Sequence, residues 1–284
     1  MSLVVPTTDN IKPPMWAPGL NTDDDLSRGL VGYWPMWEGA GDTVRDIAGN
    51  NDGVNNGTTW ETSERGAVLD FDDTSYDYVD CGTGLSLDIT EQLTLHVRAF
   101  GIDLDYGFLI AKTAESYAAP FATFGLSYNS YQDLDLVAGI GGSSVKLVEL
   151  ATGWSGWKTV TATYDGTWSH MYVDGKLESS SNTYSGALDS EPTWPVTLGA
   201  ARYAEDNESI HWPGLIDVAA IYNRALTPSE IKQLYEDPYR LITPRRTIAY
   251  STGAAPVTTG QPTMRRWGGI PYMIPGSRLL GRSW

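Results

Sequence analysis

The densest group of side chains that could bind a metal ion is a short run of aspartates. It consists of Asp70, Asp72, Asp73, Asp77 and Asp80. Carboxylate oxygens are the ligands that hard cations prefer, and alternation along a strand brings several of these side chains to one face or to the strand end. We expect a solvated acidic turn here, with a bridging cation as the alternative.

Residues for nucleophilic or acid–base catalysis are sparse. The histidines His96, His170 and His211 lie far apart in the sequence, and no nucleophile motif such as G-x-S-x-G occurs. The single cysteine, Cys81, has no partner for an internal disulfide, and we expect it to be a small buried residue. These patterns favour a protein that is not an enzyme.

A basic C-terminal segment follows an acidic body. No Asp or Glu occurs after Asp237, whereas the same segment holds seven arginines; removing their charge from the formal net charge of -16 leaves -23 for residues 1–237. Such asymmetry is typical of an interaction arm. Because apolar residues separate the arginines, the arm resembles a protein-docking segment more than a nucleic-acid-binding tract.

Membrane association is not expected. Residues 1–20 lack a basic region followed by a long apolar core, and no later run approaches about 18 apolar residues. We therefore expect neither a signal peptide nor a membrane anchor.

Short strands with tight turns dominate the pattern. Residues 93–100 alternate cleanly, which predicts that His96 points outward to solvent. Residues 157–173 predict a hairpin, and Asp174-Gly175 predicts a second turn. Together with 30 Gly, 11 Trp and 16 Tyr, this pattern favours an all-β sandwich or barrel.

The last predicted strand, residues 215–222, leads into a short helix. Thr227 suits the N-cap, Pro228 the first helical position, and Glu230 completes a capping box. The apolar face of this helix comprises Ile231, Leu234 and Tyr235, and Pro238 ends it. Since so short a helix needs tertiary support, we expect it to dock on the sheet and close the domain.

Four segments in this order and spacing resemble the laminin-G-like, concanavalin-A-like jelly-roll family. They are residues 30–53, 66–82, 157–177 and 214–235. The resemblance implies two antiparallel sheets packed face to face, in agreement with the strand pattern. We therefore predict an all-β, two-sheet jelly-roll sandwich with one short C-terminal helix, an extended N-terminal arm over 1–27, the domain over 28–237 and a basic extended arm over 238–284.

The same resemblance implies a calcium site. Members of the family often hold Ca²⁺ beside an Asn/Gly loop, and the matching positions are Asp46 and Asn50, with Asp217 as a partner across the sheet edge. The loop is shorter than the commonest form of the family. The alternative is that these side chains make turn hydrogen bonds.

Glycoside hydrolases and carbohydrate-binding proteins share this jelly roll. The hydrolases place paired carboxylates on one strand as E-x-D-x-x-E, a string that is absent here; residues 205–208 come nearest and indicate a loop. Carbohydrate-binding members use exposed aromatic platforms, although in a sandwich most aromatic residues lie in the core. The available residues are Trp154, Trp157, Trp168, Trp194, Trp212, Tyr128 and Tyr131.

The helix end and the tail are similar to laminin-G-like proteins encoded by bacteriophages. That similarity implies a non-enzymatic virion protein, either a capsid decoration (cement) protein or a tail component. It also implies a homo-oligomer, for example a trimer. The arms would dock on the major capsid protein or on tail components, and the jelly roll would face outward. The expected partner-binding residues are Arg245, Arg246, Arg265, Arg266, Trp267, Arg278, Arg282 and Trp284. The alternative is a lectin-like carbohydrate-binding module of a tail fibre or surface adhesion component that binds host glycans.

Overall fold

The computed structural model describes residues 11–13, 18–72, 77–102, 106–114, 119–201, 210–244, 265–267 and 270–272. The chain divides into two units, Met1–Arg245 and Arg246–Trp284. In the second unit, β21 (Arg265–Trp267) pairs antiparallel with β22 (Ile270–Tyr272). Within the described ranges, no helix combines the length and the apolarity that a membrane span requires.

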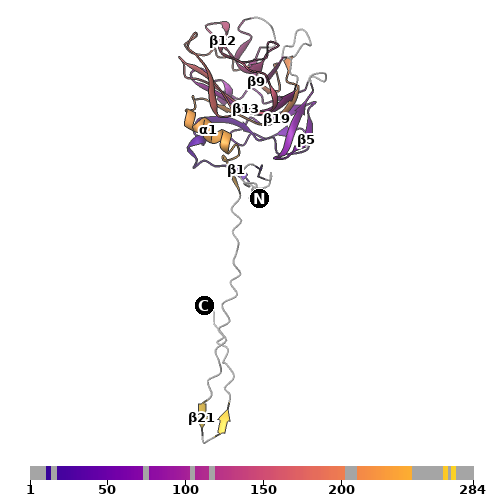
Figure 1. Ribbon diagram of the computed structural model, residues 1–284, viewed down its shortest axis with the longest axis vertical. Coiled ribbons are helices and arrows are strands. Elements are labelled where there is room, and N and C mark those ends of the chain that lie inside the picture. Colours follow the sequence, from indigo (N-terminus) through magenta and orange to yellow (C-terminus); the bar gives the residue numbers. More distant parts are fainter. Residues whose placement is uncertain are drawn as a thin grey trace, which may run out of the picture. The chain divides into compact units, whose positions relative to one another are not determined.

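Two antiparallel sheets stack in the first unit (Figure 1). The first has the order β12 (Ser143–Ala151), β11 (Asp133–Ile140), β10 (Ala122–Tyr128), β9 (Gly107–Thr113), β16 (Val196–Leu198), β7 (Tyr78–Asp80), β4 (Gly53–Asn56), β3 (Thr43–Val44). The second has the order β15 (Lys176–Ser181), β14 (Ser169–Val173), β13 (Ser155–Tyr164), β8 (Leu93–Ile102), β19 (Gly214–Tyr222), β6 (Gly66–Phe71), β5 (Thr59–Ser63), and β2 (Leu30–Trp34) also pairs with β19. The predicted jelly-roll sandwich is confirmed.

Smaller elements complete the unit. They are the strand pairs β1 (Pro18–Leu20) with β20 (Ile242–Pro244) and β17 (Ala200–Ala201) with β18 (Ile210–His211), the 3-10 helices η2 (Asp25–Ser27) and η3 (Leu85–Leu87), and the α-helix α1 (Pro228–Glu236). In Figure 1, α1 and β1 lie on the side of the β13–β19 layer that faces away from β9 and β12.

The main core fills the space between the sheets. The alternation predicted for β8 is confirmed, because Leu93, Leu95 and Val97 are fully buried in this core. Trp154 packs edge-on against two other aromatic residues, with ring centroids 6.0 Å from Tyr128 and 4.9 Å from Trp212. These three aromatic side chains stabilise the sandwich by burial of apolar surface.

A second apolar cluster, which we name the outer cluster, covers the outer face of the β13–β8–β19 sheet. Its members are Leu26, Leu30, Tyr33, Trp37, Tyr172, Val218, Ala220, Tyr222, Leu226, Ile231, Leu234, Tyr239, Leu241 and Ile242. The alternation of β19 supplies this cluster with Val218, Ala220 and Tyr222, and the apolar stripe of α1 packs on them. The expectation that the helix docks on the sheet is confirmed.

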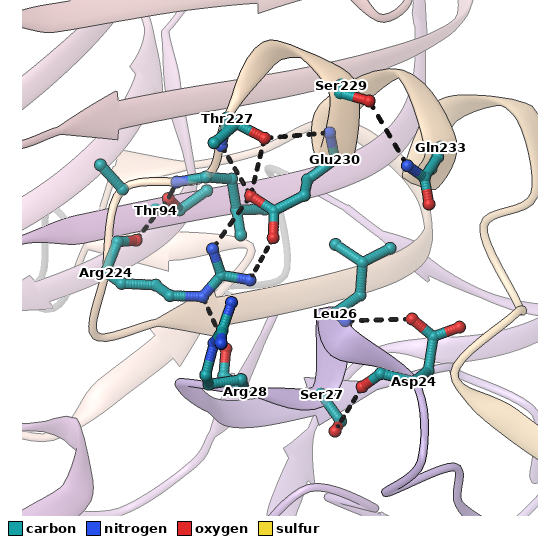
Figure 2. Close-up of polar contacts among 12 residues, drawn as sticks. Asp24, Leu26, Ser27, Arg28, Thr94, Arg224, Thr227, Ser229, Glu230 and Gln233 are labelled. Atoms are coloured by element: carbon teal, nitrogen blue, oxygen red, sulfur yellow. Dashed lines mark hydrogen bonds and ion pairs between the residues drawn. The ribbon is translucent and has the colours of Figure 1, made fainter.

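The N-terminus of α1 is capped as predicted (Figure 2). The Thr227 hydroxyl accepts the Glu230 amide, and the Glu230 carboxylate accepts the Thr227 N–H at 2.8 Å. Arg224 adds a bidentate pair with the same carboxylate, at 2.7 and 3.0 Å, and its Nε donates to the Arg28 carbonyl at 2.7 Å. This network fastens the helix start to the segment that precedes β2.

The packing of the first unit extends beyond the predicted domain of residues 28–237. On the N-terminal side, β1 pairs with β20 and Leu26 lies in the outer cluster. On the C-terminal side, Tyr239 and Leu241 are buried in the same cluster. The apolar residues on both sides of the predicted domain therefore fold onto it, and the first compact unit continues to Arg245.

A buried ion cluster joins the N-terminal segment to β8 and β19. The fully buried Asp217 carboxylate lies 2.6 Å from Lys12 Nζ and 2.6 Å from Arg98 Nη1, and it accepts the Tyr239 hydroxyl at 2.7 Å. Lys12 Nζ also donates to the Met36 carbonyl at 2.9 Å and to the Ala67 carbonyl. Lys12 Nζ, Arg98 Nη1 and the Tyr239 hydroxyl thus each have an oxygen acceptor, as burial requires.

The charges of this cluster depend on one another. Burial by itself raises the pKa of Asp217, but the attraction of Lys12 and Arg98 outweighs it, so the pKa lies below its ordinary value of 3.8. Burial lowers the pKa of Lys12. The attraction of Asp217 offsets only part of the lost hydration, because Lys12 shares this carboxylate with Arg98. The carboxylate charge is therefore the element that both cations need.

Replacement of Asp217 by Asn should lower the free energy of unfolding by about 3–5 kcal/mol, since Lys12 and Arg98 would stay buried without a counter-charge. Tyr239→Phe removes one hydrogen bond from the same carboxylate and should cost only about 1–2 kcal/mol. Urea denaturation followed by tryptophan fluorescence compares the two variants. Equal, small losses would contradict a central role for the carboxylate.

The predicted solvent exposure of His96 is wrong. Its side chain points away from the main core, but the outer cluster covers this face and leaves His96 1% exposed. The ring Nδ1 lies 2.8 Å from Thr161 Oγ1, and burial lowers the pKa of His96 to about 4.

Acid should therefore destabilise the domain through His96. Between about pH 6.5 and pH 4 the unfolded chain binds a proton at this ring while the folded chain does not, so stability falls as pH falls, by up to about 3 kcal/mol. The His96→Gln variant, which keeps an acceptor for Thr161, should lack this part of the pH dependence. Denaturation curves at half-unit pH steps test this, and parallel curves for both proteins would contradict it.

Candidate functional site

A small hollow on the outer face of the second sheet combines aromatic and charged side chains. Its volume is 270 Å³, and we name it the outer hollow. It is lined by Arg65, Arg98, Trp157, Lys158, Thr159, Asp174, Tyr235 and Glu236. These residues come from the β5–β6 turn, β8, β13, the β14–β15 turn and the last turn of α1.

Trp157 is held rigidly in the wall of this hollow. The Arg98 guanidinium lies over the indole ring, 4.1 Å from its centroid, and the Phe100 ring packs beside it at 5.5 Å. Arg98 is itself fixed by its ion pair with Asp217. The buried ion cluster therefore sets the position of a half-buried aromatic ring at the surface.

Tyr235 is the second aromatic residue that lines the outer hollow, although the sequence predicted it on the apolar face of the helix. Its side chain is 42% exposed, because it lies at the margin of the stripe formed by Ile231 and Leu234. The close approach depends on Gly175, where an added Cβ would meet the tyrosine ring at 3.0 Å. Both Asp174 and Gly175 have positive φ, as the predicted two-residue turn requires.

The outer hollow is lined by charges of both signs, and among its cations Arg98 is paired with Asp217. The Asp174 carboxylate accepts the Thr159 N–H at 2.9 Å, and the Glu236 carboxylate lies 3.7 Å from Lys232 Nζ. By contrast, no ion pair links the Arg65 or Lys158 side chain to another described residue. Aromatic walls with donors between them suit the binding of a polar ring, since the rings can stack and the cations can donate hydrogen bonds.

A larger hollow at the N-terminus of α1 is less suited to a ligand. It has a volume of 560 Å³ and lies around the side chains of Figure 2. Its principal charges neutralise one another, because Arg224 pairs with Glu230 and Arg240 pairs with Asp24 at 2.8 Å. These pairs fasten the chain segments together.

The structure does not assemble the predicted calcium ligands around one point. The Asp46 carboxylate accepts main-chain N–H groups of Tyr33 and Ala48, both at 2.9 Å, and the Asn51 side chain at 3.0 Å, while Asn50 is exposed. Asp217 belongs to the buried ion cluster. No group of three or more His, Cys, Asp or Glu side chains among the described residues could hold a metal ion. Calcium binding stays a prediction, and it would have to displace these donors.

The aspartate run makes turn hydrogen bonds. Asp77 accepts the Asp72 N–H at 3.1 Å, and Asp80 accepts the Gly82 N–H at 2.8 Å. Asp77 is nonetheless buried, so the expectation of a fully solvated turn is wrong for this residue. Asp73 and residues 205–208 lie outside the described residues.

The candidate aromatic residues divide between core and surface, and fewer of them than expected lie in the core. Trp154, Trp212 and Tyr128 are buried, whereas Trp157 and Trp194 are half-buried. The exposed members of the predicted set are Tyr131, 85% exposed, and Trp168, 43% exposed.

Most of the expected partner-binding residues lie outside the part of the chain that the structure describes. Arg245, Arg246, Arg278, Arg282 and Trp284 lie outside the described residues, and residues 265–267 are described only as the strand β21.

Of the residues that line the outer hollow, only Trp157 is among the candidate binding residues that the sequence indicates. The sequence places Tyr235 on the apolar face of the helix and gives no indication of Arg65 or Lys158. The role of Tyr235 depends on its position beside the turn that contains Gly175, and only the tertiary fold reveals this contact. Lys158 is adjacent to Trp157 in the sequence, but that pair alone does not indicate a site.

Comparison with known proteins identifies the family. Residues 73–232, more than half of the chain, match the concanavalin A-like lectin/glucanases superfamily. No curated protein sequence matches the chain.

Solved structures share the fold at low identity. The binding domain of Paraclostridial Mosquitocidal Protein 1 is 16% identical with a TM-score of 0.56, and the match covers 76% of this chain and 54% of that one. Domain 4 of an extracellular arabinanase from Geobacillus stearothermophilus, in complex with arabinotriose, is 14% identical with a TM-score of 0.53, covering 72% and 98%. The botulinum neurotoxin serotype C1 binding domain is 11% identical with a TM-score of 0.55, covering 75% and 53%.

The first and third of these structures are binding domains, and the second is one domain of an arabinanase. The chain spans about half the length of the first and third. Trypanosoma rangeli sialidase also shares the fold, over only 33% of its own chain. The family match and the jelly-roll sandwich agree, and the chain belongs to the concanavalin A-like lectin/glucanases superfamily.

Proposed function

We propose that this protein is a carbohydrate-binding module, and that the outer hollow holds a sugar ring between Trp157 and Tyr235. The observation that carries the proposal is that a half-buried and an exposed aromatic side chain line one hollow together with Arg65, which has no ion pair among the described residues. Sugar rings present C–H faces that stack on aromatic rings and hydroxyls that accept hydrogen bonds from cations.

Preorganisation supports the assignment of Trp157 to this role. Because Arg98 and Phe100 fix the indole before any ligand arrives, little conformational entropy is lost on binding. The comparisons support the same direction, since the similar structures include binding domains and a domain in complex with arabinotriose.

Removal of the exposed ring tests the site. Tyr235→Ala should weaken binding of a glycan identified on an array by about tenfold or more, ~1.4 kcal/mol, because one stacking surface is lost. Isothermal titration with the full chain measures it. Tyr131→Ala, at the tip of the β10–β11 hairpin and 85% exposed, is the matched control and should bind normally. Equal affinity of both variants, or an array without any bound saccharide, would contradict the proposal.

A second candidate function is that of a non-enzymatic bacteriophage virion protein, such as an oligomeric capsid decoration protein or a tail component. It is favoured by the division of the chain at Arg245, beyond which a separate unit carries arginines and no carboxylates. Arginine suits such docking through bidentate pairs with carboxylates and stacking on aromatic rings. The two functions are compatible, because a virion protein can also bind host glycans.

Deletion of residues 246–284 separates the tail from the first unit. The deletion spares Tyr239 and Leu241, which belong to the outer cluster, so the remaining chain should fold with an unchanged melting temperature. It should lose incorporation into virions, measured by immunoblotting of purified particles, while its glycan affinity persists. Normal incorporation would contradict the docking role of the tail.

A further inference from the structure

The turn between β13 and β14 presents an indole ring to solvent. Trp168, in this turn, is 43% exposed, and it is the only exposed tryptophan among the described residues; the others are buried or half-buried. An indole combines a large apolar face with an N–H donor, so it suits ligands that are apolar on one side and polar on the other.

The turn holds this ring in place. Asp165 Oδ1 accepts the Thr167 N–H at 2.8 Å and the Trp168 N–H at 2.7 Å, and the Asp165 N–H donates to the Trp168 carbonyl at 3.1 Å. The indole lies nearly parallel to the His170 ring, at an interplanar angle of 4° with centroids 6.2 Å apart. The imidazole is fixed in turn, because its Nδ1 lies 2.7 Å from Ser180 Oγ. Trp168 is therefore ordered without a ligand, which reduces the entropy lost on binding.

A neighbouring loop adds a second exposed aromatic residue. The Gly186 N–H donates to the Gly166 carbonyl at 3.0 Å, and the Tyr164 hydroxyl donates to the Gly186 carbonyl at 2.7 Å. These bonds fasten the loop that follows β15 to the turn that carries Trp168. Tyr184, two positions before Gly186, is 41% exposed. Two exposed aromatic side chains thus come from loops that are joined at one end of the sheet.

The polar group in this turn is a hydrogen-bond acceptor. Asp165 is exposed, and its Oδ2 has no hydrogen bond or ion pair with a described residue. A carboxylate oxygen accepts hydrogen bonds from hydroxyl groups and repels anions, and the formal net charge of -16 adds to this repulsion. An indole beside a free carboxylate oxygen therefore suits an uncharged ring that carries hydroxyl groups.

This surface is separate from the outer hollow. Met171 belongs to the main core, so its neighbours His170 and Tyr172 point to the outer face of the sheet. Trp168 precedes β14 at one end of this face, and Asp174, which lines the outer hollow, follows β14 at the other. Six positions of extended chain span ~20 Å. A small ligand at Trp168 is consequently independent of one at the outer hollow.

We infer that Trp168 and Asp165 form a second carbohydrate-binding site, specific for a neutral sugar ring. One C–H face of the ring stacks on the indole, and a ring hydroxyl donates to Asp165 Oδ2. The ligand class rests on the proposed carbohydrate-binding function, whereas the location does not depend on the outer hollow. Two sites on one domain would let the protein bind a polysaccharide surface with avidity.

Fluorine NMR of the full chain, labelled with 5-fluorotryptophan, observes this indole directly. The resonance that disappears in Trp168→Phe belongs to Trp168. The probes are three neutral trisaccharides: cellotriose, xylotriose and maltotriose. At least one of them should shift the Trp168 resonance in a saturable manner. The same shift should persist in the Tyr235→Ala variant, in which the outer hollow has lost an aromatic side chain.

Variants test the two groups of the site. Trp168→Ala should remove one of two binding sites in isothermal titration with the trisaccharide that binds. Asp165→Asn keeps an oxygen acceptor for the turn N–H groups but replaces the free carboxylate oxygen, and it should weaken binding at Trp168 by about tenfold. Glu61→Gln, an exposed carboxylate on β5 at the other edge of the same sheet, is the matched control and should bind normally.

The outcomes separate this inference from the proposed function. If none of the three probes shifts the Trp168 resonance, the second site is overturned, while binding that is sensitive to Tyr235→Ala would leave the outer hollow standing. If the resonance shifts but Asp165→Asn binds normally, recognition by the carboxylate is overturned. If the resonance shifts and Tyr235→Ala has no effect on any saccharide, the second site stands and the outer hollow does not. Thermal melting of each variant verifies that it is folded.

Discussion

The buried carboxylate of Asp217 is the constraint on which the outer half of this domain depends. Two cations from distant parts of the sequence converge on it, one from the N-terminal segment and one from β8. Neither Lys12 nor Arg98 could remain in an apolar environment without this partner, because an isolated buried charge is far more costly than a paired one. One side chain on β19 therefore determines where the N-terminal segment lies and where the guanidinium of Arg98 points.

The buried ion cluster also fixes side chains at the surface. Arg98 contacts Asp217 through Nη1, and its guanidinium carbon lies 4.1 Å from the centroid of the Trp157 ring, so one group connects the charged interior to the wall of the outer hollow. Gly175, in the turn after β14, leaves room for Tyr235, which also lines the outer hollow. The site consequently rests on sheet residues and a capped helix, which are more rigid supports than long loops.

Local patterns predicted the elements well, because their causes are local. The capping box of α1 follows from the spacing of Thr227 and Glu230, and the inward positions of β8 follow from alternation. The environment of the outward positions could not be predicted in the same way. His96 points outward as its position in the strand requires, but a non-local layer built from α1 and both chain ends covers it. For the same reason the ion pair of Asp217 could not be predicted, because its partner Lys12 is about two hundred positions away in the sequence. The outer hollow depends on five chain segments, and no sequence spacing encodes their meeting.

The pairing of β1 with β20 has a mechanical consequence. Pro18 lies opposite Pro244 and Leu20 opposite Ile242. The N-terminal end of β1 and the C-terminal end of β20 therefore form the same end of the ladder. A pulling force transmitted through Arg245 would open this ladder one residue pair at a time, as a zipper opens, and proline contributes no N–H at the first pair. A force transmitted from the N-terminal side reaches Lys12 first and must extract a buried ammonium from Asp217. The two tethers of one domain thus differ in their resistance to load: the C-terminal one yields gradually, and the N-terminal one is held until an ion pair breaks.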